Sequence, residues 1–229
     1  MKLAIMQPYF FPYIRYWQLI NAVDLFVIYD DVNYMKQSFI NRNFILVGNE
    51  SQKITLEVMG ASSYKHINDI FIGNNNQKIL ETLRQAYRRA PEYDKIFPLV
   101  QSILESPEKN LAKFLAGLIE KISNYLEVKT KIIFSSDIEK NCNLKGQEKI
   151  LDICKNLRSS NYVNAINGIN LYDKEKFTKE GVELNFIDSE IVEYKQFKEN
   201  FIPNLSIVDI MMFNSKEEIK KMLSKYKLT

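Results

Sequence analysis

Residues 4–43, AIMQPYFFPYIRYWQLINAVDLFVIYDDVNYMKQSFINRN, decide the fold. Apolar runs at residues 3–6 and 25–29 are too short for helices and rich in branched or aromatic side chains, which favours strands. Between them, apolar positions recur at helical spacing over residues 14–20. The stretch therefore predicts strand, short helix, strand, with the helix as a right-handed crossover between two parallel strands of one sheet.

Polar side chains follow both predicted strands. Gln7 comes directly after the first strand, and Asp30 and Asp31 come after the second. A polar Asn-Arg-Asn run at residues 41–43 follows within reach of the same edge. Because ligands of open α/β sheets bind at the carboxyl ends of the strands, we expect an amide, a carboxylate and a guanidinium to converge in one cleft.

The chain as a whole predicts an α/β fold with a mostly parallel sheet flanked by helices and a helical insertion at about residues 76–128. Three apolar stripes fill that insertion, and Pro91 and Pro107 separate them. No Gly/Ser-rich linker flanks it, so we expect one domain over residues 1–229 with this helical subregion inserted. Elsewhere, strands are predicted at residues 52–58, 67–72, 131–134, 162–164 and 184–187, and helices at 146–157, about 204–212 and 216–227.

Composition excludes several classes of protein. With 46% hydrophobic and 26% charged residues the chain is an ordinary globular protein, and its net charge of +3 gives no indication of a nucleic-acid partner, so no DNA binding is predicted. Cys142, Cys154 and a lone His66 are too few for a structural zinc site, and reduced thiols indicate a cytoplasmic protein. Pro8 interrupts the first apolar run, which argues against a signal peptide, and no run of about twenty apolar residues predicts a membrane span.

Motifs of common cofactor sites and of serine hydrolases are missing from the sequence. No GxGxxG follows the first strand, and neither a Walker loop nor a GxSxG elbow occurs. No cofactor and no metal are therefore predicted.

Three residues are candidates for catalysis. Asp30 and Asp31 end a buried strand, where a carboxylate can accept a proton, bind a sugar hydroxyl or hold a cation. Side chains alternate along a strand, so only one of the two is expected in the site, and Asp30 is favoured over a capping role. His66 lies in a loop with Ser62 and Ser63, where a solvated surface position is the main alternative to acid/base work.

A second group of residues suits ligand binding. Arg42 between Asn41 and Asn43 can hold phosphate or carboxylate in two-point fashion, with a surface ion pair as the alternative. Tyr9 and Tyr13 belong to a ring-rich loop whose side chains can stack on a base or a sugar, or simply pack over the sheet.

Two further dipeptides follow predicted strands, and turn formation is the alternative role for both. They are Ser135-Ser136 and Asn167-Gly168.

The stretch at residues 6–43 resembles the opening signature of the WbqC-like proteins of bacterial O-antigen and other surface-polysaccharide loci. The likeness spans residues 4 to about 213 and continues through Tyr87-x-x-Ala90-Pro91, Ser135-Ser136, Lys145-Gly146, Tyr162-Val163-Asn164 to Leu171-Tyr172, and Phe201-x-Pro203-x-Leu205-Ser206-Ile207-x-Asp209. The chain departs from the family pattern at Asn33, where glutamine is usual, at Arg15, where glycine is usual, and at Asn167-Gly168, where two glycines are usual.

The resemblance implies an acyl or aminoacyl transfer, often described as glycyl transfer, onto an amino sugar during polysaccharide assembly. The expected partner is a nucleotide-linked or lipid-linked amino sugar. In this scheme Arg42 holds a phosphate, Asp30 removes a proton from the sugar amine, and Gln7 with Tyr9 or Tyr13 positions the sugar. The alternatives are a non-catalytic nucleotide-sugar or carrier-binding module and an ATP-dependent amino-acid ligase.

Overall fold

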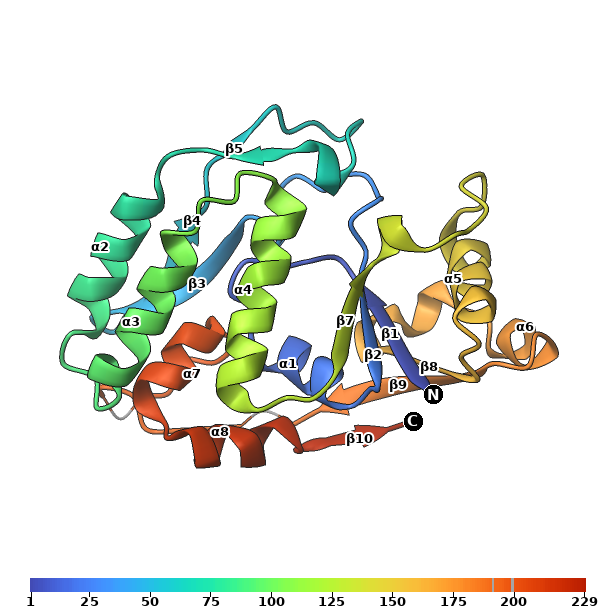
Figure 1. The fold of residues 1–229 in the computed structure, drawn as a ribbon. Helices are drawn as coiled ribbons and strands as arrows, with labels where there is room; N and C mark the ends of the chain where they lie inside the picture. The colour runs from blue at the N-terminus through green and yellow to red at the C-terminus, as the bar shows by residue number, and fades with distance from the viewer. Residues whose placement is uncertain (191, 199) are drawn as a thin grey trace.

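A six-stranded sheet forms the centre of the computed structural model, which describes residues 1–190, 192–198 and 200–229 (Figure 1). The strand order is β10-β9-β8-β1-β2-β7, and only the β9–β10 pairing in this sheet is antiparallel among the described residues. The strands are β1 (Lys2–Met6), β2 (Leu25–Ile28), β7 (Lys131–Phe134), β8 (Asn161–Ala165), β9 (Glu183–Ser189) and β10 (Tyr226–Leu228). The predicted α/β class with a mainly parallel sheet is confirmed.

The opening unit has the predicted order of strand, helix and strand. Strands β1 and β2 pair in parallel, from Leu3 opposite Leu25 to Met6 opposite Ile28, and α1 (Ile14–Asn21) connects them. Trp17 is fully buried on this helix, and its indole N–H donates to the Pro12 carbonyl at 2.9 Å. This bond ties the ring-rich loop to the start of α1.

Helices cover both faces of the sheet. Ala4 and Phe26 face the hydrophobic core that includes α1, α7 (Ile207–Phe213) and α8 (Lys216–Leu223). Leu3 and Val27 face a second core beneath α5 (Gly146–Asn156) and α6 (Lys174–Lys179). Burial on both faces explains why the strand sequences are continuously apolar rather than alternating.

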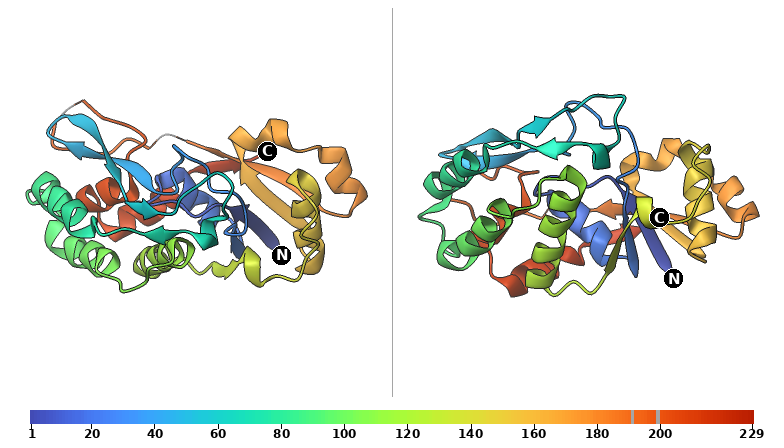
Figure 2. Two further views of the ribbon diagram at one scale, coloured as in Figure 1. Left: turned by 90° about the horizontal axis from the view of Figure 1, so that it is seen from above. Right: turned by 45° about the horizontal axis from the view of Figure 1, so that its top comes forward.

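The predicted helical insertion consists of three helices that extend the first core. They are α2 (Asn76–Tyr87), α3 (Tyr93–Leu104) and α4 (Leu111–Leu126). Leu83, Val100 and Leu115 are fully buried among them. Figure 2 shows these helices at the end of the molecule away from α5 and α6. None of the described helices has the length and apolar character needed to cross a bilayer.

Some segments differ from prediction, and two of them precede the three helices α2, α3 and α4. The polar run that was expected at the edge of the main sheet instead begins the hairpin of β3 (Arg42–Val47) and β4 (Glu50–Thr55). The expected strand at residues 67–72 is a 3₁₀ turn, η1 (Ile67–Asp69), followed by the short β6 (Phe71–Ile72), which pairs with β5 (Val58–Met59).

The predicted closing helix at residues 216–227 ends at Leu223. Residues 226–228 form β10 instead, because β9 offers an unpaired edge, on which Tyr226 lies opposite Ser189. The amphipathic pattern of residues 216–227 predicts only local structure and gives no information about pairing with a distant strand.

Candidate functional site

A cavity of about 720 Å³ lies at the point where the strand order reverses. Within the sheet, β2 and β7 lie on one side of β1. The chain later returns to form β8 on the other side of β1. The cavity lies at the carboxyl ends of three strands. Its lining includes Gln7 just after β1, Asn164 near the end of β8 and Ser189 at the end of β9. This topological switch point is where open α/β sheets bind ligands.

Aromatic rings make up much of the cavity wall. The rings that line it belong to Tyr9, Tyr13, Tyr16, Tyr29, Phe39 and Tyr172. Burial, and next the neighbouring Tyr13, raise the pKa of Tyr9 to about 12. Burial also raises the pKa values of Tyr13 and Tyr172. These hydroxyls therefore stay protonated near neutral pH and can donate hydrogen bonds to a ligand.

Arg15 is the one formally charged side chain among the described residues that line the cavity. It lies in the first turn of α1, which contains no acidic residue and whose N-cap, Tyr13, makes no side-chain cap bond. Among the described residues, no carboxylate forms an ion pair with Arg15. A guanidinium beside a helix N-terminus is suited to an anionic ligand group.

Amide groups complete the wall on the side of β8. Asn167 and Gly168 lie in the 3₁₀ helix η3 (Ile166–Leu171), and both line the cavity with Asn164. A Cβ added at Gly168 would lie 3.1 Å from Nδ2 of Asn164, so glycine permits the close approach of η3. The oxygen of the Asn164 amide accepts from the Ala165 N–H at 2.7 Å.

The structure thus brings together one part of the predicted site. Gln7, Tyr9, Tyr13, Asn167 and Gly168 share this cavity. Other lining residues were not among the predicted site residues, and they include Arg15, Tyr29, Asn164, Tyr172 and Asn204. Two of these, Tyr29 and Asn164, stand at the ends of predicted strands.

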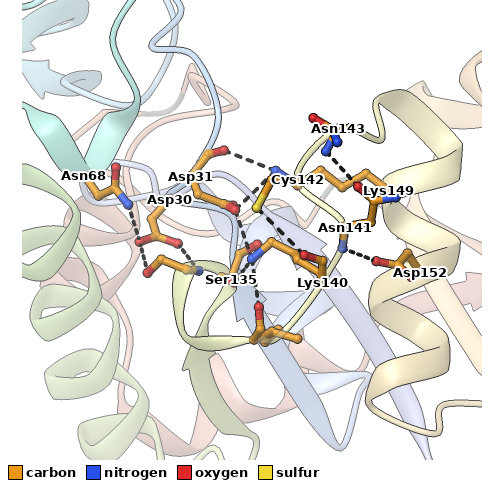
Figure 3. Close-up of polar contacts among 12 residues, drawn as sticks. Asp30, Asp31, Asn68, Ser135, Lys140, Asn141, Cys142, Asn143, Lys149 and Asp152 are labelled. Carbon is orange, nitrogen blue, oxygen red and sulfur yellow. Dashed lines mark hydrogen bonds and ion pairs between the residues drawn. The ribbon is translucent and has the colours of Figure 1, made fainter.

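Asp30 is outside this cavity, which corrects the expectation that it converges with Gln7. Its side chain is 2% exposed and accepts three hydrogen bonds (Figure 3). The donors are the Ser136 N–H at 3.0 Å, the Ser136 hydroxyl at 2.6 Å and Nδ2 of Asn68 at 3.2 Å. The carboxylate therefore joins the ends of β2 and β7 to η1, and the proton-abstracting role predicted for it has no support from this geometry.

Asp31 forms a separate cluster with two lysines. Its Oδ2 lies 3.0 Å from Nζ of Lys140 and 3.2 Å from Nζ of Lys149. Burial would raise the pKa of Asp31, but the Ser135 hydroxyl and the two ammonium groups outweigh it and hold that pKa below its ordinary value. Asp31 is therefore ionised and paired with two ammonium groups, and its lowered pKa makes it a poor general base.

Asn41 and Asn43 bind other parts of the chain rather than a ligand. The Asn41 amide accepts from the Tyr34 hydroxyl at 2.9 Å and donates to the Leu56 carbonyl at 2.8 Å. The Asn43 amide donates to the Phe11 carbonyl at 2.7 Å, and Phe11 has a φ of 44°, which is unusual for a bulky residue. Asn43 thus holds the ring-rich loop in its strained conformation.

The remaining predicted residues also lie away from the cavity. Arg42 begins β3 and is partly buried, with a buried Nε that has no hydrogen-bond partner among the described residues. His66 is exposed, and its backbone forms an isolated antiparallel β-bridge with Asn33. Ser135 is fully buried. The expectation that Arg42 meets Gln7 in one cleft is therefore corrected, because pairing with β4 carries Arg42 into a different sheet.

These features define a doubly wound α/β protein with a ring-lined, cationic cavity at its topological switch point. The family model of the WbqC-like protein family matches residues 7–221, and the chain belongs to that family.

A curated relative shares 29% identity with the chain over 230 residues, covering 92% of each protein. It is an uncharacterized protein, Rv1507c, of Mycobacterium tuberculosis. No solved structure matches the chain.

Proposed function

We propose that the switch-point cavity is the substrate site of an acyl or aminoacyl transferase. The acceptor would be the amine of a nucleotide-linked or lipid-linked amino sugar in bacterial surface-polysaccharide assembly, and glycyl transfer is one form of the reaction. The observation that carries the proposal is the pairing of a single unopposed guanidinium, Arg15, with a wall of tyrosine rings. Rings suit the faces of a sugar or base, and the guanidinium suits a phosphate.

The reaction requires positioning and charge stabilisation. The sugar nitrogen attacks the carbonyl carbon of an activated ester or thioester, the bond to the leaving oxygen or sulfur breaks, and the nitrogen loses a proton to that leaving group through solvent. Tyr9 and Tyr13 line the cavity and keep their protons because burial raises their pKa values, so their hydroxyls can donate hydrogen bonds. They would stabilise the oxyanion that develops on the carbonyl oxygen.

A second candidate is a non-catalytic module that binds the same sugar ligand. One observation favours it: the described residues that line the cavity include no Asp, Glu, His, Lys or Cys. The Ser189 hydroxyl lines the cavity, but no described lining residue is a side chain that usually serves as a general base near neutral pH and could activate it. ATP-dependent ligation of a free amino acid is the third candidate from the sequence, and no feature of the cavity supports it.

The proposal also retains the cytoplasmic location predicted from the cysteines. Its support is that Cys142 and Cys154 are both free thiols, the first exposed and the second buried.

The test has two stages. Thermal shift against a panel of nucleotide-linked amino sugars identifies a ligand, and mass spectrometry then follows that sugar in the presence of acyl thioesters, aminoacyl-tRNA, or a free amino acid with ATP. An added acyl mass on the sugar supports the transferase, and its dependence on ATP would identify the ligase instead. Stabilisation without any mass change favours the binding module, and failure of every sugar to stabilise the protein contradicts both.

A further inference from the structure

Two lysine ammonium groups share one carboxylate beside the cavity (Figure 3). The side chains of Lys140, Lys149 and Asp31 are 3%, 10% and 14% exposed. The cluster therefore holds one positive charge in excess at a place with little access to water. Burying an ammonium group costs solvation free energy, and a carboxylate already paired with another ammonium returns only part of it.

Lys140 accounts for the structural half of the cluster. Its ammonium donates to the Ser135 carbonyl, to the Ile138 carbonyl at 3.2 Å and to Oδ2 of Asp31 at 3.0 Å. An ammonium group has three N–H donors, so these contacts use all of them. Lys140 with Asp31 is enough to fasten the loop that follows β7 to the end of β2.

Lys149 supplies the surplus charge. It reaches the same Oδ2 of Asp31 at 3.2 Å and the Asp31 carbonyl at 3.2 Å, and its Nζ lies 5.1 Å from the centroid of the Tyr29 ring. Two of its donors are thus engaged by Asp31, and the third is not assigned to any oxygen of the described residues. The ring face is a weaker partner than an anion.

The position of Lys149 relates it to the cavity. It lies in the first turns of α5, and the next residue, Ile150, lines the cavity, as does Tyr29 on which the ammonium rests. Asp31 holds the ammonium in place at the end of β2, whereas Arg15 lies at the start of α1. Arg15 therefore lines the cavity directly, whereas Lys149 lies outside the lining and next to two residues that belong to it, Tyr29 and Ile150.

We propose that Lys149 forms an anion subsite at the edge of the cavity and that it takes the diphosphate of the ligand. This inference rests on the proposed function for the identity of the ligand, and it names that ligand as a diphosphate-linked sugar. Nucleotide sugars and isoprenoid-linked sugars both carry this group, so the shared chemistry is the diphosphate itself.

The test measures binding of inorganic pyrophosphate, UDP and farnesyl diphosphate by isothermal titration calorimetry at low ionic strength. We expect Lys149→Met to raise the dissociation constant for pyrophosphate at least tenfold and Lys149→Arg to retain most of the affinity. The melting temperature of ligand-free Lys149→Met should not fall, because Asp31 and Lys140 remain as a one-to-one pair. Lys155→Met is the matched control on the same helix, since Lys155 forms a surface pair with Glu180 at 2.5 Å.

Unchanged pyrophosphate affinity in Lys149→Met overturns the subsite, and so does an equal loss in Lys155→Met. A Lys149→Met protein that melts earlier yet binds normally assigns Lys149 a structural role and overturns it as well. Tighter binding of UDP than of pyrophosphate indicates a nucleotide-linked ligand, and tighter binding of farnesyl diphosphate indicates a lipid-linked one. Because no transfer is measured, pyrophosphate binding can succeed while the transferase proposal fails, and the reverse.

Discussion

The Ser136 hydroxyl donates a hydrogen bond to Oδ2 of Asp30 at 2.6 Å, and the Ser136 N–H donates to Oδ1 at 3.0 Å. These two bonds join the end of β2 to the turn after β7, and the carboxylate that accepts them is 2% exposed. The pair therefore links two neighbouring strands of the sheet, with a buried Asp30 accepting from an exposed Ser136.

The first prediction is that Asp30→Asn destabilises the fold. An amide in place of the carboxylate presents an NH₂ group to one of the Ser136 donors, so a hydrogen bond to a charged group is lost, and such a bond contributes about 1.5–3 kcal/mol. Urea denaturation measures this free energy, and Asp137→Asn is the control because Asp137 is exposed in the same turn. If Asp30→Asn kept full stability but lost transfer activity, the predicted role of Asp30 as a base would regain support.

The second prediction concerns Arg15. Arg15→Gln should weaken binding of UDP roughly tenfold or more, because a charge-assisted hydrogen bond contributes about 1.5–3 kcal/mol. Stability should not change, since Arg15 forms no ion pair with any described residue. Calorimetric titration checks the affinity, with Arg88→Gln at the exposed C-cap of α2 as the control. Equal affinities for the two variants would remove Arg15 from the anion site.

Local patterns were enough to predict the framework of the fold. The opening strand-helix-strand unit and the three helices α2, α3 and α4 follow from apolar periodicity, which is a property of neighbouring residues. Strand β10 was not predicted because its existence depends on pairing with β9, which lies some forty residues earlier in the chain, as Tyr226 lies opposite Ser189. Pairing between distant strands leaves little trace in the local sequence.

The candidate site could be predicted in part for the same reason. Gln7 and Asn167 were selected because they follow strands, and the carboxyl ends of parallel strands meet at one edge. The Asn43 amide instead binds the Phe11 carbonyl, and the hairpin of β3 and β4 places Arg42 elsewhere. These long-range contacts decided which of several equally suitable polar residues face the cavity.

The third prediction uses the close approach of η3 to β8. Gly168→Ala places a Cβ 3.1 Å from Nδ2 of Asn164, a residue that lines the cavity, so the amide must shift by a few tenths of an ångström. We expect a loss of stability of about 1 kcal/mol and weaker binding of the sugar ligand identified by thermal shift.

Gly117→Ala is the matched control for this substitution. Gly117 lies in the interior of α4, and a Cβ added there meets nothing within 4 Å. Alanine should therefore stabilise the protein by up to about 1 kcal/mol through its higher helix propensity and should leave ligand binding unchanged. Wild-type affinity in Gly168→Ala would show that the added methyl group does not disturb the ligand site, which would contradict the prediction.

The fourth prediction concerns the pH dependence of stability. Asp209 is fully buried in α7, and its carboxylate accepts from the Tyr87 hydroxyl at 2.7 Å, the Tyr194 hydroxyl at 2.5 Å and Nε2 of Gln196 at 3.0 Å. Burial raises the pKa of Asp209 and outweighs these three hydrogen bonds. The pKa values of both tyrosines are also raised, so neither hydroxyl ionises in the range where Asp209 titrates.

Because the folded-state pKa of Asp209 lies above its unfolded value of 3.8, folding takes up a proton. The stability that this group contributes is fully present below pH 3.8 and is lost as the pH rises through the raised pKa. Asp209→Asn should lack this decline, because asparagine does not ionise. As the pH rises, the unfolding free energy of the wild type should therefore fall relative to that of the variant. Urea denaturation at a series of pH values checks this expectation. A difference that stays constant across the series would show that Asp209 keeps an ordinary pKa in the folded protein.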